Sequence, residues 1–171
     1  MVAETAEAVL VPRPAHCVDT TDWHPKLVRL YRYWVELSRQ AGGGIPLRRS
    51  FDATLVPDLL PQIWMLDIQY EPTYRLRYRL LGTRIERQLG RQLRGRWLDE
   101  CTPQIANTDY VTRYRNVSLT GIPSHRKGVP TFWHDKVATI ENVVLPFTEQ
   151  GSCASCLMVH TRFYHSDGKE F

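Results

Sequence analysis

The sequence predicts an α+β domain in which helices flank an antiparallel sheet of five strands. Three observations support this class: an amphipathic helical segment near the N-terminus, two alternating segments joined by a short turn, and three strand-like segments after a second long helix. Strands that follow one another in hairpins, rather than alternating with helices, favour an antiparallel sheet over a parallel one.

The composition is that of a globular protein. The chain has 171 residues, enough for one domain with its own core. Hydrophobic residues make up 43% and charged residues 23%, which excludes a disordered or collagen-like chain. The net charge of +4 permits an anionic partner without requiring one. Glu4 and Glu7 stand where a signal peptide needs positive charge, and no long apolar run exists, so we expect a cytoplasmic protein without a membrane span.

The N-terminal part is predicted to contain a leader and a helix. Residues 1–21 show no periodicity and are predicted to be flexible. Residues 22–44 are predicted to hold an amphipathic helix that three glycines end. Its apolar residues cover about half the circumference, more than the ~100° that a surface helix needs. We therefore predict a homodimer in which Leu27, Tyr31 and Trp34 anchor the helix on apolar surface, partly that of its own domain and partly across the dimer interface.

Residues 45–171 are predicted to form the main domain. A short helix candidate over 52–60 precedes two strand-like segments, 63–70 and 74–81. The three-residue turn between them predicts a hairpin that brings Asp67 close to Arg77 or Arg79.

The second half of the domain is predicted to hold two helices and a three-stranded meander. Thr83 and Glu86 fit a capping box, so a short helix is expected before Gly90. Thr102 and Pro103 are typical of a helix start, which predicts a longer helix over 103–120. Strands are then expected near 124–133, 138–148 and 153–164.

A ligand pocket is predicted between helix 103–120 and the sheet. Tyrosine hydroxyls buried there would need partners, which makes the gap more polar than a dry core. Plain core packing is the alternative for each single residue. The predicted lining is Tyr110, Tyr114 and Val117 from one stripe of the helix and Trp133, Leu145 and Val159 from the strands.

Other motifs carry weaker signals. Residues 75–96 contain eight arginines and one acid, a density that can bind phosphate backbones. Three of these arginines alternate along a strand as on a solvated face, and exposed stacking aromatics are missing, so nucleic-acid binding is not expected. Cys153 and Cys156 form a CxxC without a second pair and would point to opposite faces of a regular strand, so no zinc is expected.

The sequence shows no catalytic constellation. The HExxH, GxSxG, P-loop and GxGxxG patterns do not occur, and we therefore expect no enzyme. The alternative from this class is a cone-shaped α+β enzyme of the ketosteroid-isomerase kind. It would need a buried carboxylate facing a tyrosine, for which Asp109 and Asp135 are the candidates.

Two segments, 77–85 and 89–100, resemble a PAS domain, and more narrowly a bacterial PAS-like family of alphaproteobacteria that was first filed as a domain of unknown function. The resemblance spans about residues 23–165. Gln92 departs from it, where an aspartate is expected. Further matching pieces are Trp34, Ile45-Pro46, Phe51-Asp52, Asp67, residues 121–123, Glu141 and residues 145–147.

The resemblance implies a five-stranded sheet with a pocket under the long helix, and a role in signal transduction. We expect a stand-alone sensor or adaptor that binds a small metabolite, a signalling partner or both. Flavin-binding relatives carry a cysteine in an NCRFLQ-like motif, and haem-binding ones a histidine near the long helix. Since this chain has neither, no haem or flavin is expected, and the ligand stays unknown.

Overall fold

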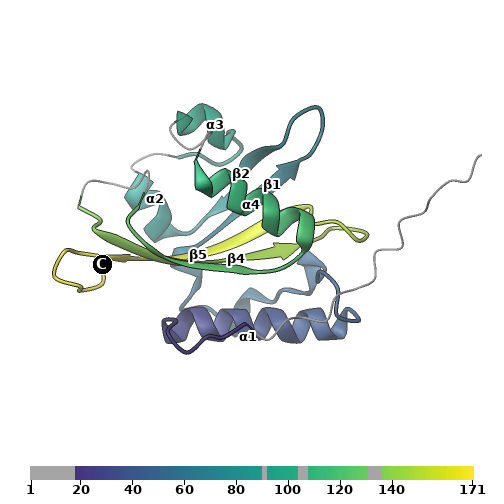
Figure 1. The fold of residues 1–171 in the computed structure, drawn as a ribbon, viewed down its shortest axis with the longest axis horizontal. Helices are drawn as coiled ribbons and strands as arrows, with labels where there is room; N and C mark the ends of the chain where they lie inside the picture. The colour runs from purple at the N-terminus through teal and green to yellow at the C-terminus, as the bar shows by residue number, and fades with distance from the viewer. Residues whose placement is uncertain (1–17, 90–91, 104–107, 131–135) are drawn as a thin grey trace, which may run out of the picture.

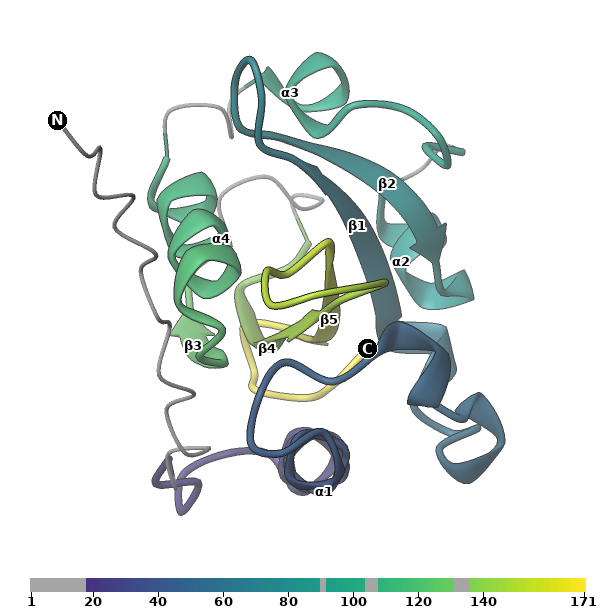
Figure 2. The same ribbon diagram turned by 90° about the vertical axis from the view of Figure 1, so that its right-hand side faces the viewer.

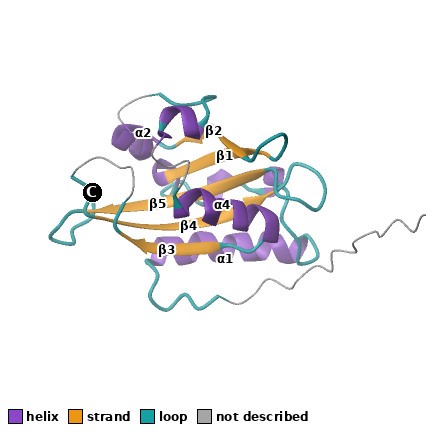
Figure 3. Ribbon diagram, turned by 45° about the horizontal axis from the view of Figure 1, so that its top comes forward, coloured by secondary structure: helices purple, strands orange, loops and turns teal. Residues whose placement is uncertain are grey.

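The computed structural model describes residues 18–89, 92–103, 108–130 and 136–171. It contains one five-stranded antiparallel sheet in the order β2-β1-β5-β4-β3, which confirms the predicted α+β class. Figure 1 shows helices on both faces of this sheet, and Figure 3 shows the same layers by element type. The strands are β1 Ile63–Gln69, β2 Arg75–Leu81, β3 Ser124–Gly128, β4 Thr139–Phe147 and β5 Cys156–Tyr164. The helices are α1 Pro25–Gln40, α2 Thr83–Leu89, α3 Leu98–Cys101 and α4 Asp109–Thr120.

Helix α1 packs against one face of the sheet, over β1, β4 and β5. Figure 2 looks along α1 and shows it lying against the strands, opposite α2, α3 and α4. His24 caps the helix, with its ring Nδ1 accepting a hydrogen bond from the Lys26 amide at 3.1 Å. The Trp34 indole donates to the carbonyl oxygen of Pro146 at 2.8 Å and so ties the helix to the end of β4.

The apolar face of α1 is therefore buried within the chain. Leu27, Tyr31 and Trp34 are 0%, 5% and 3% exposed. They pack on the apolar side chains that β1, β4 and β5 present on this face, such as Met65 and Phe147. The prediction that these three side chains anchor the helix on apolar surface is confirmed, but the part that placed them across a dimer interface is wrong, because the sheet of the same chain buries them.

The opposite face of the sheet carries a second hydrophobic core. Residues of β1, β2, β4 and β5 meet α2, α3 and α4 there. Because both faces are covered, β4 is buried from Ile140 to its end, and β5 from Cys156 to Phe163. Within the described ranges, no helix is long and apolar enough to cross a membrane.

Several local predictions are confirmed, and others differ from the structure in element type or bounds. Asp67 on β1 contacts both Arg77 and Arg79 on β2, as expected from the hairpin. The segment predicted as a helix over 52–60 forms short 3-10 turns instead, at Ala53–Leu55 and Leu60–Gln62. Thr102, predicted to begin the long helix, instead ends α3, and helix α4 begins at Asp109. Part of the predicted 103–120 range lies outside the described residues.

A histidine is buried in the layer between α1 and the sheet. His160 on β5 is 0% exposed, and neither ring nitrogen has a hydrogen-bond partner among the described residues. Burial, aided by the nearby positive charge of Arg162, lowers its pKa to about 3. Helix α1 encloses this side of β5, on which Met158 also lies.

This burial predicts a pH dependence of stability. Since the pKa of His160 is about 3 in the folded chain and 6.5 in the unfolded one, its contribution is complete above pH 6.5 and is lost as the pH falls toward 3. We expect the free energy of unfolding to fall by about 2 kcal/mol between pH 7 and pH 5. Urea unfolding at several pH values measures this slope.

The matched variant is His160→Leu, in which the free energy of unfolding should depend much less on pH. A smaller dependence should remain from His24, because burial lowers its pKa too. His165→Gln, at an exposed position after β5, serves as the control and should keep the slope. An unchanged slope in His160→Leu would contradict the burial of His160 under α1.

Candidate ligand site between α4 and the sheet

Helix α4 is fixed over the sheet by polar contacts at its C-terminal end. Gly121 adopts a positive φ of 69° and ends the helix, as its position predicted. Ser118 donates to the carbonyl oxygen of Tyr114 at 2.8 Å, and its hydroxyl also lies 2.9 Å from the hydroxyl of Tyr74. Helix α4 is thereby attached to the segment just before β2, which closes one end of the site.

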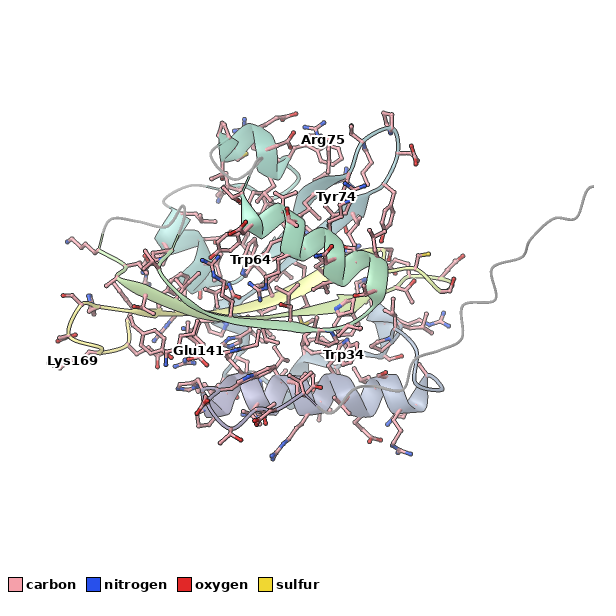
Figure 4. The ribbon with its side chains drawn as sticks, in the orientation of Figure 1. Trp34, Trp64, Tyr74, Arg75, Glu141 and Lys169 are labelled. Atoms are coloured by element: carbon pink, nitrogen blue, oxygen red, sulfur yellow. The ribbon has the colours of Figure 1, made fainter. Side chains whose placement is uncertain are left out.

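Aromatic side chains fill the space under α4. Tyr110 and Tyr114 are each 1% exposed and meet edge to face, with ring centroids 5.9 Å apart. Trp64, labelled in Figure 4 on this side of the sheet, lies 6.2 Å from the ring of Tyr114. Its indole donates to the Thr161 hydroxyl at 3.0 Å. The structure thus brings both predicted tyrosines to the inner face of α4.

The Tyr114 hydroxyl is a buried polar group in this core. It has no hydrogen-bond partner among the described residues, and burial raises its pKa well above the usual 10.0. At neutral pH it is therefore a neutral phenol, able to donate a hydrogen bond to an acceptor.

The structure confirms some of the other predicted lining residues and not others. Val117 and Val159 lie in the same core as the tyrosines. Leu145 does not: it packs under α1, and its neighbour Val144 faces α4 instead. The prediction for Leu145 is wrong because adjacent residues of a strand point to opposite faces. Trp133 lies outside the described residues.

Arg113 on α4 was missed from the sequence. Its Nε donates to the Ser124 hydroxyl at 2.8 Å, and its two terminal nitrogens donate to the Asn142 side-chain oxygen at 2.8 Å and the Ser124 carbonyl at 2.9 Å. Burial lowers the pKa of this guanidinium. A single arginine on a helix reads as a surface residue, so no sequence signal marked it.

Among the described residues, one groove opens on each of two sides of α4. The larger, about 390 Å³, runs between α4 and β3 and is lined in part by Arg113, Asn116 and Ser124. The smaller, about 270 Å³, lies between α4, α3 and β2, beside Tyr74 and Asp99. Both give solvent a path to the edges of the tyrosine core.

The sheet order and the helix across its face agree with a comparison against family models. The model of a family described as PAS domain matches residues 23–157, well over half of the chain. The chain belongs to the PAS domain family. The match begins just before α1, so this helix is part of the matched region. No curated protein matches the chain.

Membership of the PAS family bears on the enzyme alternative. Domains of this family are sensor or interaction modules. A cone-shaped enzyme would need a carboxylate in the tyrosine core, but Asp109 is exposed and Asp135 lies outside the described residues. Among the described residues, the buried carboxylate is that of Glu141, which belongs to the α1 side of the PAS sheet.

Several of the arginines of residues 75–96 pair with acids from outside this segment of the PAS domain. Arg75 pairs with Asp99 and Glu100, and its guanidinium stacks on Trp97 at 4.3 Å. Arg79 contacts Glu149 in addition to Asp67. These pairs lower the density of free positive charge that the sequence indicates.

The CxxC cysteines are separated by their local structure. Cys153 is exposed in the turn before β5, whereas Cys156 is buried at the first position of the strand. Burial raises the pKa of Cys156 to about 12, so its thiol stays protonated at neutral pH. The described residues contain no group of three or more His, Cys, Asp or Glu arranged for a metal. The prediction of no zinc stays a prediction.

Proposed function

We propose that this PAS domain is a non-enzymatic cytoplasmic sensor that binds a small polar molecule under α4. The observation that carries the proposal is the Tyr114 hydroxyl, buried and without a partner in the described structure. Leaving a buried hydroxyl unsatisfied costs about 1–3 kcal/mol. A ligand that accepts its hydrogen bond would recover this free energy.

The signal would leave through a protein partner or a second copy of the chain. Because Leu27, Tyr31 and Trp34 are buried under the sheet, a homodimer would have to use other surfaces. The polar outer side of α1, with Arg29 and Arg32, is such a surface.

An adaptor without a ligand is the second candidate. It is favoured by the aromatic filling under α4, where Trp64, Tyr110 and Tyr114 contact one another. The two candidates differ in what the Tyr114 hydroxyl does: it binds a ligand in a sensor and has no role in an adaptor.

Tyr114→Phe separates the two. Removing an unsatisfied buried hydroxyl while keeping the ring should raise the free energy of unfolding of the ligand-free chain by about 1 kcal/mol. The sensor proposal adds a second expectation, that the variant retains at least tenfold less of the small molecule that co-purifies with the wild-type chain. Urea unfolding and mass spectrometry of the released molecule measure the two effects.

Tyr74→Phe is the matched control, because the hydroxyl of Tyr74 has a partner in Ser118. It should lose about 1 kcal/mol of stability rather than gain it. If no small molecule co-purifies with the wild-type chain and Tyr114→Phe gains stability, the adaptor candidate replaces the sensor. If the variant retains the same small molecule in the same amount as wild type, the Tyr114 hydroxyl does not bind it and the proposed site is wrong.

A further inference from the structure

Arg113 is a half-buried cation that has no ion-pair partner among the described residues. Its three hydrogen bonds go to neutral oxygens of Ser124 and Asn142. A guanidinium has five N–H groups, so two of them have no acceptor within the described ranges. Buried charges in proteins are as a rule paired, because desolvating an unpaired one is costly.

A second cation lies close by. Arg126 on β3 stacks over the ring of Tyr110, with its guanidinium carbon 4.9 Å from the centroid. Its charge is near enough to Arg113 to lower the pKa of that group further. In the described part of the chain, Arg126 forms no ion pair, so two positive charges face one region from α4 and β3.

An acid on the same helix does not neutralise Arg113. Asp109 precedes Arg113 by four residues, a spacing that often gives an ion pair on a helix. Here the Arg113 side chain turns to β3 and β4 instead, and no contact within 4.0 Å joins it to Asp109. Asp109 is exposed at the end of the same groove.

An uncharged donor adds to the cluster. Asn142 is 0% exposed, and its side-chain nitrogen has no partner among the described residues. Its side-chain oxygen already accepts a hydrogen bond from Arg113. Exchanging the amide oxygen and nitrogen would therefore place two hydrogen-bond donors against each other. Arg113 lines the groove between α4 and β3. Asn142 lies behind Arg113 on β4, and Arg126 lies beside it on β3, over the ring of Tyr110.

We propose that the groove between α4 and β3 binds the oxyanion group of a small carboxylate or phosphate through Arg113 and Arg126. The planar guanidinium matches both groups with two parallel hydrogen bonds. The groove of about 390 Å³ has room for a small anion, and Asn116 and Ser124 supply further polar groups along it. This inference does not require a ligand at the Tyr114 hydroxyl.

Titration of the full chain with sodium phosphate and with sodium succinate tests the proposal, each at constant ionic strength maintained with chloride. We expect at least one of the two anions to raise the melting temperature saturably and to bind measurably in calorimetry. Comparing the affinities for phosphate and succinate tells whether the groove fits a phosphate or a carboxylate. If neither anion binds saturably to the wild-type chain, the proposal fails.

The variants locate the site. Arg113→Gln should weaken binding at least tenfold, and Arg126→Gln severalfold, because each removes one positive charge. Arg115→Gln removes an equal charge from the same helix, but Arg115 lies over the ring of Tyr74, away from the groove, so its affinity should stay unchanged. Arg126→Gln keeps the test decisive if Arg113→Gln fails to fold. Equal affinities in wild type and in the folded variants would overturn the proposal.

Discussion

Glu141→Ala is expected to lower the free energy of unfolding by about 3–5 kcal/mol, the usual cost of removing one partner from a buried charged network. Glu141 is 1% exposed and accepts hydrogen bonds from the His24 amide at 2.7 Å and the Tyr164 hydroxyl at 3.1 Å. The His125 ring and the Lys127 ammonium lie 3.1 and 3.6 Å away. Urea unfolding at pH 7 measures the loss.

The pKa of Glu141 indicates the direction of this effect. Burial opposes the charged form, yet the hydrogen bonds from His125 and the His24 amide, with the charge of Lys127, lower the pKa to about 2. The carboxylate therefore stabilises the fold above pH 4.5 and loses this contribution as the pH falls toward 2.

Two variants serve as controls for Glu141. Glu141→Gln keeps an acceptor oxygen and should lose less than Glu141→Ala. Glu149→Ala removes an exposed carboxylate that pairs with Arg48 and Arg79, and should cost less than about 1 kcal/mol. Because Glu141 binds the N-cap residue of α1, hydrogen exchange of the first α1 amides should speed up in Glu141→Ala. A loss no larger than that of Glu149→Ala would contradict the buried network.

Trp34→Ala is expected to cost about 3–5 kcal/mol, the range for deleting a buried tryptophan. The variant would leave a cavity under α1 and would also remove the donor to the Pro146 carbonyl. Figure 4 labels Trp34 between α1 and the sheet and Glu141 on the same side. Both variants therefore test whether α1 is docked, one through packing and the other through charge.

The matched control for Trp34 is Arg32→Ala on the exposed side of α1, which should change stability by less than about 0.5 kcal/mol. The free energy of unfolding of Trp34→Phe should lie between those of Trp34→Ala and Arg32→Ala. If Trp34→Ala is as stable as Arg32→Ala, α1 does not pack on the sheet in solution, and the dimer interface predicted from its apolar arc would deserve a second test.

The sheet and its helices could be predicted from the sequence because their signals are local. Alternation marked the hairpin, and Gly121 marked the end of α4. What covers a surface is not a local property. The apolar arc of α1 shows that a wide face is buried, but not that the sheet of the same chain buries it.

The candidate site could be predicted in part for the same reason. The spacing of Tyr110 and Tyr114 placed both on the inner side of α4, whereas β4 is apolar on both faces, so alternation could not tell whether Val144 or Leu145 faces the helix. Arg113 could not be predicted, because its partners Ser124 and Asn142 come from β3 and β4 and only the fold brings them together.

The central claim is that this PAS domain holds a small molecule under α4, and native mass spectrometry of the freshly purified full chain tests it most directly. The spectrum also reports whether the chain is a homodimer. We expect a species heavier than the polypeptide by one small molecule, which is released on denaturation and is depleted in Tyr114→Phe. The bare polypeptide mass, before and after incubation with a metabolite extract and identical in both proteins, would contradict the claim.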